Sequence, residues 1–146
     1  MIRGYHDTFS LDQAITANAA STNQIDLRAI RNLGVGARPL YVVVQVTTQL
    51  SDSGDNSNCT VYFRTDEYAA LNAATNSQTV GVFATNAPVG TRLVQVIQQG
   101  NANERYCDLY YSMGTGDLSA GAVTAFITPD PQLWTGYANN YVISTT

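Results

Sequence analysis

The feature that most constrains the fold is the alternation of apolar and polar residues along most of the chain. The clearest case is the run LYVVVQVTTQL at residues 40–50, which is rich in β-branched side chains and contains no Gly or Pro. A second run, NCTVYFRT at residues 58–65, places Cys59, Val61 and Phe63 on one face. This period of two is typical of strands that bury one face. We therefore expect an all-β protein.

Further strands follow from the same alternation. They are expected at residues 78–84, 91–98, 105–113 and 120–128, with two weaker ones at 11–16 and 23–27. Residues 66–74, DEYAALNAA, are the one segment that could form a helical turn. Pro129 and Pro131 should end the last strand, because proline cannot donate a hydrogen bond to a neighbouring strand. About eight short antiparallel strands favour a sandwich, and that number favours the jelly roll, in which two four-stranded sheets are joined by Greek keys.

A chain of 146 residues has the length of one domain. We expect a single jelly-roll domain over residues 1–146, with an N-terminal arm at about residues 1–10 and an aromatic C-terminal tail at about residues 129–146. In jelly-roll order, the strands that carry Cys59 and Cys107 are antiparallel neighbours. Each cysteine lies near the start of its strand, so the two thiols should lie at opposite ends of the pair and remain unbridged.

The charge composition excludes several kinds of partner. Only 12% of the residues are charged, all seven basic residues are arginine, and the formal net charge is −4. A nucleic-acid partner would need a basic patch, so none is expected.

No apolar run approaches the length of about 18 residues that a membrane span needs. The opening MIRGYHDTFS has no apolar signal-peptide core, so we expect the protein to be made in a cytoplasm and kept there, or released only when a cell lyses.

Residues that could support catalysis or hold a metal are scarce. His6 is the only histidine, and it precedes the first expected strand, so a Ser-His-Asp or Cys-His site is not expected. Glu67 and Glu104 show nothing that separates a glycosidase pair from ordinary surface acids. The polar loop around Asp52 and Asp55 contains oxygen ligands for a calcium ion but lacks EF-hand spacing, which favours a plain hairpin loop. We expect no enzyme activity, no cofactor and no metal.

Aromatic residues with a polar end are abundant, because the chain has nine Tyr and one Trp against four Phe. Such rings are favoured at interfaces, where one end is buried and the other finds a hydrogen bond. Two interpretations are open. The tyrosines form a face that contacts another protein chain or a sugar, or they lie on a second sheet face that the chain's own loops cover. The residues concerned are Tyr62, Tyr106 and Tyr110 on the strand faces opposite the expected core, and Trp134, Tyr137 and Tyr141 in the tail.

Two segments resemble a known family. ITANAASTNQIDL at residues 15–27 and GVGARPLYVVVQV at residues 34–46 are similar to the opening of the capsid cement proteins of Bordetella-phage-type tailed phages. In that family an A-S-T-N-x-I-D-L stretch precedes a G-x-G-x-P-L-Y-V-V-V-Q-V strand. The family has Gly after I-D-L, where this chain has Arg28, so the connection to Gly34 is expected to differ in shape. The rest of the chain agrees with the family in length and strand rhythm.

The resemblance implies a jelly-roll decoration protein. Such proteins form trimers on the outside of an icosahedral head and bridge neighbouring major capsid proteins of the HK97-type fold. The similar segments mark no site residues. Position and composition instead suggest contact residues in the two chain ends, where arginines and aromatic residues are free to reach a partner. These are Ile2, Arg3, Tyr5, His6 and Phe9 in the arm, and Trp134, Tyr137 and Tyr141 in the tail.

The alternative function is a carbohydrate-binding or receptor-binding module of a virion. It would use Tyr62, Tyr106 and Tyr110 as an aromatic platform, with a cation at Asp52 and Asp55. Glycan binding without capsid binding would favour this alternative over the cement protein.

Overall fold

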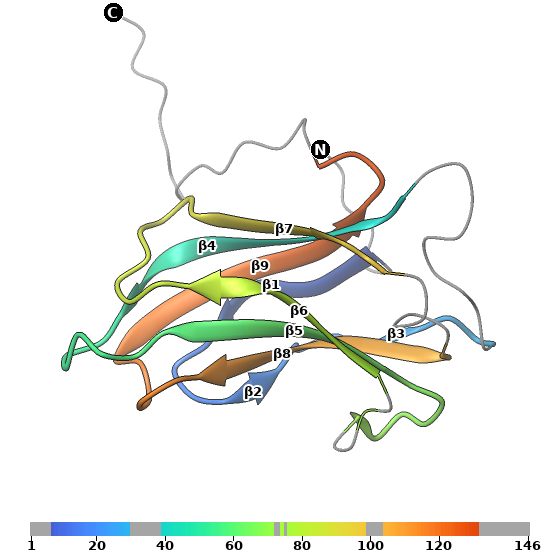
Figure 1. The fold of residues 1–146 in the computed structure, drawn as a ribbon, viewed down its shortest axis with the longest axis horizontal. Helices are drawn as coiled ribbons and strands as arrows, with labels where there is room; N and C mark the ends of the chain where they lie inside the picture. Colours follow the sequence, from blue (N-terminus) through green and yellow to red (C-terminus); the bar gives the residue numbers. More distant parts are fainter. Residues whose placement is uncertain (1–6, 30–38, 72–73, 75, 99–103, 132–146) are drawn as a thin grey trace, which may run out of the picture.

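The computed structural model describes residues 7–29, 39–71, 74, 76–98 and 104–131. These residues form a sandwich of two antiparallel sheets (Figure 1). Sheet A has the strand order β1 (Thr8–Ala14), β9 (Ala120–Thr128), β4 (Tyr41–Ser51) and β7 (Arg92–Val96). Sheet B has β2 (Ala19–Ala20) and β3 (Ile25–Asp26) beside β8 (Tyr106–Met113), followed by β5 (Cys59–Asp66) and β6 (Asn76–Phe83). Among the described residues no helix is long and apolar enough to cross a membrane.

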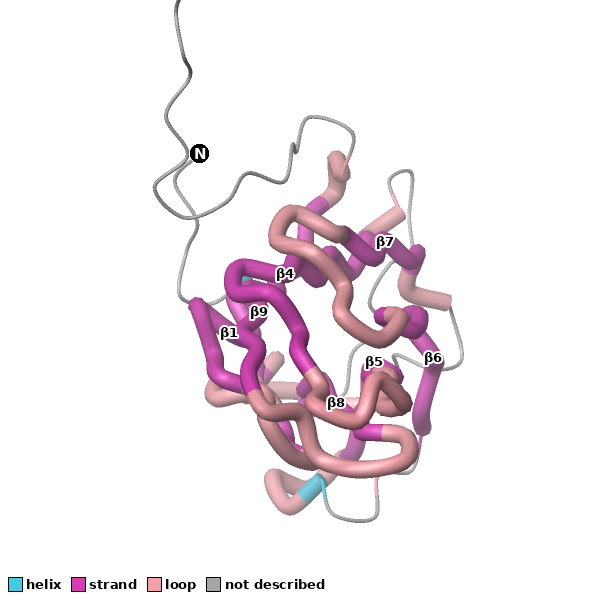
Figure 2. The backbone as a smooth tube through the Cα atoms, turned by 90° about the vertical axis from the view of Figure 1, so that its left-hand side faces the viewer, coloured by secondary structure: helices cyan, strands magenta, loops and turns pink. Residues whose placement is uncertain are grey.

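The described elements are strands in two antiparallel sheets, so the all-β prediction is confirmed. Their order in the two sheets is that of a jelly roll, as predicted. The short strands β2 and β3 both pair with β8 and together fill one position of sheet B. The nine strands of the described residues therefore occupy eight jelly-roll positions. Figure 2 shows the two sheets from the side, with β1, β9, β4 and β7 in one layer and β8, β5 and β6 in the other.

Two local expectations differ from the structure. Strand β1 begins at Thr8, so residues 8–10 belong to the sandwich and not to the arm expected over residues 1–10. The strand expected at 23–27 is shorter, and β2 precedes it. Within residues 66–74, residues 67–69 form bends and Leu71 has a 3₁₀-helical conformation, which agrees with the helical turn expected in this segment. Strand β9 does end at Thr128, immediately before the first of the two prolines, as predicted.

The core lies between the inward faces of the two sheets. Val42, Val44 and Val46 alternate inward from β4, as the period of two predicts. The rings of Phe9 and Phe63 meet edge to face across the core, with centroids 6.2 Å apart and planes inclined at 69°. Each fully buried side chain of this size contributes about 1.5–3 kcal/mol to the hydrophobic stabilisation of the fold.

Hydrogen bonds join the two sheets along their sides and through the core. On one side, the Gln78 side chain on β6 donates to the Val96 carbonyl at 2.7 Å and accepts from the Gln98 amide at 3.0 Å. On the other side, Gln13 on β1 donates to the Ala20 carbonyl at 2.8 Å. Inside the core, the hydroxyl of Tyr111 lies 2.7 Å from the hydroxyl oxygen of Ser10. The sandwich is therefore held together by polar contacts as well as by its apolar core.

The two thiols lie at opposite ends of the β5–β8 pair, as predicted. Cys59 faces Met113, whereas Cys107 faces Thr65 six positions along β5. Both cysteines are free and buried. Burial raises the pKa of each thiol to about 12, with the nearby Asp108 carboxylate adding to the effect at Cys107.

Candidate functional site

A group of aromatic and charged side chains lies on the outer face of sheet B. Tyr62 on β5 stands directly opposite Tyr110 on β8, and Arg64 stands opposite Asp108 in the same strand pair. These four residues alternate with the core residues of their strands, so they project away from the core, as the sequence predicted for the tyrosines. We call Tyr62, Arg64, Asp108 and Tyr110 the Tyr–Arg face.

The charges of the Tyr–Arg face are paired with each other. The Arg64 Nε donates to Asp108 Oδ1 at 2.9 Å, and its Nη2 donates to Oδ2 at 2.6 Å. The Arg64 guanidinium carbon also lies 4.4 Å from the ring centroid of Tyr110. The Asp108 side chain is only 5% exposed, and this burial raises its pKa, against the lowering effect of Arg64. The result is a fixed, locally neutral arrangement of one guanidinium, one carboxylate and one ring.

A similar arrangement lies where β3 meets β8. The Arg105 Nε and Nη2 atoms each donate to a different carboxylate oxygen of Asp26 at 2.9 Å. The Arg105 guanidinium carbon lies 4.7 Å from the ring centroid of Tyr106. The hydrogen bond from Arg105, with a second from the Arg28 amide, lowers the pKa of Asp26 to about 2. This pair is exposed, so solvent screens it far more than the pair formed by Arg64.

These arginines change the interpretation of the tyrosines as a sugar platform. A sugar stacks on the face of an aromatic ring, but a guanidinium covers one face of both Tyr106 and Tyr110. The three tyrosines do share the outer side of sheet B, and Tyr62 and Tyr110 are neighbours. The arrangement therefore offers less ring surface for stacking than the sequence alone suggested.

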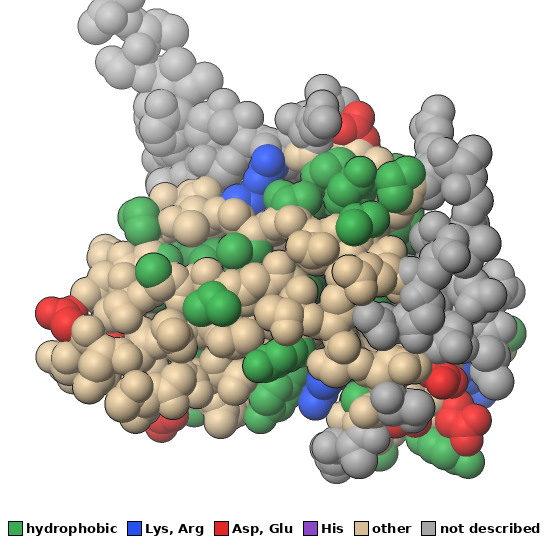
Figure 3. All heavy atoms as spheres, in the orientation of Figure 1, with side chains coloured by type: hydrophobic (Ala, Val, Ile, Leu, Met, Phe, Trp, Pro, Cys, Tyr) green, Lys and Arg blue, Asp and Glu red, His purple; other side chains and the backbone are tan. Residues whose placement is uncertain are grey.

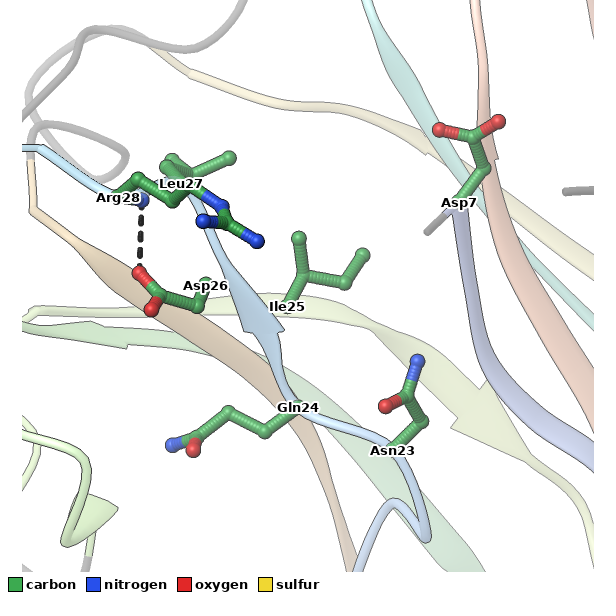
Figure 4. Close-up of a pocket in the computed structure, with 7 residues that line it drawn as sticks. All are labelled: Asp7, Asn23, Gln24, Ile25, Asp26, Leu27 and Arg28. Atoms are coloured by element: carbon green, nitrogen blue, oxygen red, sulfur yellow. Dashed lines mark hydrogen bonds between the residues drawn. The ribbon is translucent and has the colours of Figure 1, made fainter. Parts of the chain in front are cut away.

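A groove of about 430 Å³ lies between the start of β1 and the strand β3. Its lining residues are Asp7, Asn23, Gln24, Ile25, Asp26, Leu27 and Arg28. Figure 4 shows Asp7 on one side and the β3 residues on the other, with the aliphatic side chain of Ile25 between them. The Asn23 side chain donates to the Thr8 carbonyl at 2.7 Å and so connects the two walls. The groove combines apolar side chains with a polar rim, as protein-binding surfaces commonly do.

Both ends of the described chain leave the sandwich close to this groove. Thr8 at the start of β1 faces Phe126 on β9, and Thr128 at the end of β9 faces Tyr41 at the start of β4. The end of the sandwich that carries the groove, the start of β1 and the end of β9 is called the terminal end below; it lies at the right of Figure 1. The expected contact residues Ile2, Arg3, Tyr5, His6, Trp134, Tyr137 and Tyr141 lie outside the described residues.

Phe9 differs from the other expected contact residues because the structure describes it. Its side chain is fully buried in the core against Phe63. Sequence reasoning placed Phe9 in a free arm because the first strand was expected to begin only at Leu11. A side chain with no exposed surface in this fold is a core residue, so Phe9 is removed from the set of contact residues.

The polar loop between β4 and β5 uses its oxygens to hold itself together. The Asp52 carboxylate accepts backbone N–H groups from Gly54 at 3.1 Å, Asn56 at 3.0 Å and Ser57 at 2.9 Å. These bonds lower the pKa of Asp52. The Asn86 side chain, in the β6–β7 connection, donates to the Asp55 carboxylate. In the part of the chain that the structure describes, no group of three or more His, Cys, Asp or Glu residues is placed to hold a metal ion.

Comparison with known proteins identifies the family. A search of curated proteins finds no match. A scan against protein-family models matches residues 9–127 to Bbp16, a family named for a Bordetella phage protein. The match begins in β1 and ends in β9, so it spans both sheets of the sandwich. Because it covers most of the sequence, the chain belongs to the Bbp16 family and is a bacteriophage structural protein of the Bordetella-phage type.

Proposed function

We propose that this protein is a capsid cement protein, which decorates the outer surface of an icosahedral phage head. In this proposal it binds as a homotrimer, bridges major capsid proteins of the HK97-type fold and stabilises the expanded shell. It acts by binding and not by catalysis, and it needs no cofactor, nucleic acid or membrane. Membership of the Bbp16 family supports the virion role, and the resemblance of residues 15–27 and 34–46 to cement proteins supports the finer one.

The observation that carries the proposal is the arrangement of the terminal end. The start of β1, the end of β9 and the groove lined by Asp7 and β3 lie together on one end of the sandwich. Chain segments that leave there can bind a surface next to the groove, so several weak contacts act on the same partner. In a closed trimer this surface is presented three times, and the contacts add by avidity without any single one being strong.

The charge of the chain agrees with a position outside the shell. The formal net charge is −4 and the isoelectric point is near 4.6, whereas a protein on the inner surface would face packaged DNA. Most of the molecular face in Figure 3 is apolar or uncharged polar, with its few acidic side chains near the rim. If the protein fits the expanded shell better than the precursor, its binding stabilises the expanded state by that difference in affinity.

The test mixes the purified full chain with undecorated expanded heads and images them by electron cryo-microscopy. We expect additional density with the size and shape of the sandwich over three-fold positions, with the terminal end toward the shell. Heads that stay bare at micromolar protein would contradict the cement function. Density with another symmetry would keep the cement function and replace the trimer.

Two variants test the terminal end as the shell contact. We expect Asp7→Asn, on the rim of the groove, and Trp134→Ala, in the tail, to weaken attachment to heads by about tenfold each, as loss of one contact in a multivalent interface does. The matched control is Asp117→Asn, which removes the same charge from an exposed position at the other end of the sandwich. Occupancy on heads is measured by quantitative gel analysis of sedimented particles. Equal loss in the control would show that overall charge, not the terminal end, controls attachment.

The alternative is a carbohydrate-binding or receptor-binding module of the virion. It is favoured by one observation, the common outward face of Tyr62, Tyr106 and Tyr110 on sheet B. A glycan array and a comparison of thermal melting with and without calcium test it. A specific glycan signal together with bare heads would replace the cement function by this alternative.

A further inference from the structure

We propose that the Tyr–Arg face of sheet B is the surface that binds a second copy of this chain. The inference rests on the homotrimer of the proposed function and deepens it by naming the contact surface. In a closed trimer the contact is head-to-tail, so this face of one copy meets a different surface of the next copy.

The position of the Tyr–Arg face leaves the terminal end free. The face consists of outward side chains of β5 and β8 in sheet B, whereas the start of β1 and the end of β9 belong to sheet A. Of the strands at the terminal end, β3 alone shares sheet B with the face, and it pairs with the first residues of β8. Figures 1 and 2 show these two strand pairs in different layers of the sandwich. One copy can therefore contact a neighbouring copy through sheet B while its terminal end contacts the shell.

On the side toward β6, the surface around the Tyr–Arg face is uncharged. Across the sheet, Tyr110 and Tyr62 are continued by Thr79 on β6, which is exposed. In the next row, Ser112 faces Thr60, and Thr60 faces Val82, whose side chain is 49% exposed. Tyrosine and arginine are enriched at protein interfaces, where they provide area at a small cost in side-chain entropy.

Charge favours a copy of this chain as the occupant. The chain carries a net charge of −4, so two copies repel each other over most orientations. On the Tyr–Arg face the only charged side chains, Arg64 and Asp108, neutralise each other through two hydrogen bonds. A second acidic chain can therefore approach here without meeting an excess of negative charge. The same pairing disfavours an acidic peptide or a phosphate, because the Asp108 carboxylate already neutralises the guanidinium that would bind it.

The face is also rigid before any partner arrives. The Arg64 guanidinium is held by its hydrogen bonds to Asp108, and its central carbon lies 4.4 Å from the ring centroid of Tyr110. Side chains that are already held lose less conformational entropy on binding, which favours association. A patch of free, flexible arginines would lack this advantage.

The test measures the mass of the full chain by sedimentation velocity over a range of concentrations. Thr79→Glu adds a negative charge directly beside Tyr62 of the face, and Tyr62→Thr removes a ring while keeping a residue suited to a strand; we call these two the face variants. The matched control, Thr48→Glu, adds the same charge at an exposed position of β4 in sheet A. We expect both face variants to weaken self-association at least tenfold, and the control to behave as the unchanged chain does. Thermal melting of each variant verifies that the sandwich is intact.

The outcomes separate this inference from the proposed function. Face variants that keep the mass of the unchanged chain would overturn the inference. An unchanged chain that is monomeric both in solution and on decorated heads would overturn it as well, while leaving the cement function in place. If both face variants dissociate while the control stays associated, the inference is supported. The same result together with bare heads would support the contact between copies and refute the cement function.

Discussion

The two ends of the sandwich are built differently. At the end opposite the terminal end, called the loop end, the connections β4–β5, β6–β7 and β8–β9 bond to one another. The buried Ser57 hydroxyl donates to the Gly116 carbonyl at 2.5 Å, and the Thr85 hydroxyl donates to the Ser57 carbonyl at 2.8 Å. The terminal end has instead an exposed ion pair, Arg105 with Asp26, and an open groove. A rigid end and an open end on one sandwich suit a protein that keeps its shape while one end adapts to a partner.

The first prediction uses the two native thiols as reporters of the two ends. Cys59 lies at the loop end on β5, which is paired on both sides, whereas Cys107 lies beside the two-residue edge strand β3. Local opening of β3 should expose Cys107 long before Cys59 is exposed. We expect Cys107 to react with iodoacetamide at least tenfold faster, as measured by peptide mass spectrometry of timed samples.

The pH dependence of that reaction follows from the raised pKa values. Both thiols have a pKa of about 12 in the folded protein, against 9.0 for an ordinary cysteine. The reactive thiolate therefore forms mainly after opening, and the labelling rate should rise with pH up to about 9. The raised pKa values also predict that the contribution of the two thiols to stability is constant below pH 9 and is lost as the pH rises toward 12, because the unfolded chain releases these protons first. Equal labelling of the two thiols would remove the contrast between the ends.

The second prediction concerns the hydrogen bonds of the loop end. Ser57→Ala removes the buried hydroxyl that donates to Gly116, and we expect the free energy of unfolding to fall by about 1 kcal/mol. Ser53→Ala, at an exposed position of the same loop, is the control and should stay within about 0.5 kcal/mol of the unchanged chain. Urea denaturation measures both. A Ser57 variant as stable as its control would show that these bonds do not hold the loop end.

The third and smallest effect is expected from salt and acid. The depressed pKa of Asp26, about 2, means that its ion pair stabilises the fold above pH 4 and that this contribution is lost as the pH falls toward 2. Salt at about 0.5 M should screen this exposed pair and reduce the effect of Asp26→Asn. The effect of Asp52→Asn should persist, because Asp52 binds three backbone N–H groups of its own loop. Thermal melts at two salt concentrations distinguish the two, and equal salt dependence would contradict the contrast.

The long strands could be predicted from sequence because burial of one face imposes a period of two. Residues 40–50 and 58–65 alternate over their whole length, and their pairing order followed from the number of strands. The start of strand β1 was predicted at Leu11, three residues after its actual start at Thr8. The alternation is interrupted there, because the pairing with β9 shifts register twice and Asp12 has a φ of 49°. Strands β2 and β3 have two residues each, too few for any period to be visible.

The candidate surfaces were predictable only in part. The outward position of Tyr62 and Tyr110 followed from alternation, but the bond between Arg64 and Asp108 depends on the exact register of β5 against β8. That register is set by the packing of the core, which no local pattern contains. The groove likewise arises where the edge strands β1 and β3 of two different sheets separate, so it is a property of the assembled sandwich.

The burial of both thiols has a practical consequence for handling the protein. The chain contains two cysteines and no lysine, and both sulfur atoms are enclosed by the sandwich. A third cysteine introduced at an exposed position such as Thr48 would therefore be alkylated faster than either native cysteine. A dye or tether could be attached there with a maleimide while both native cysteines are retained.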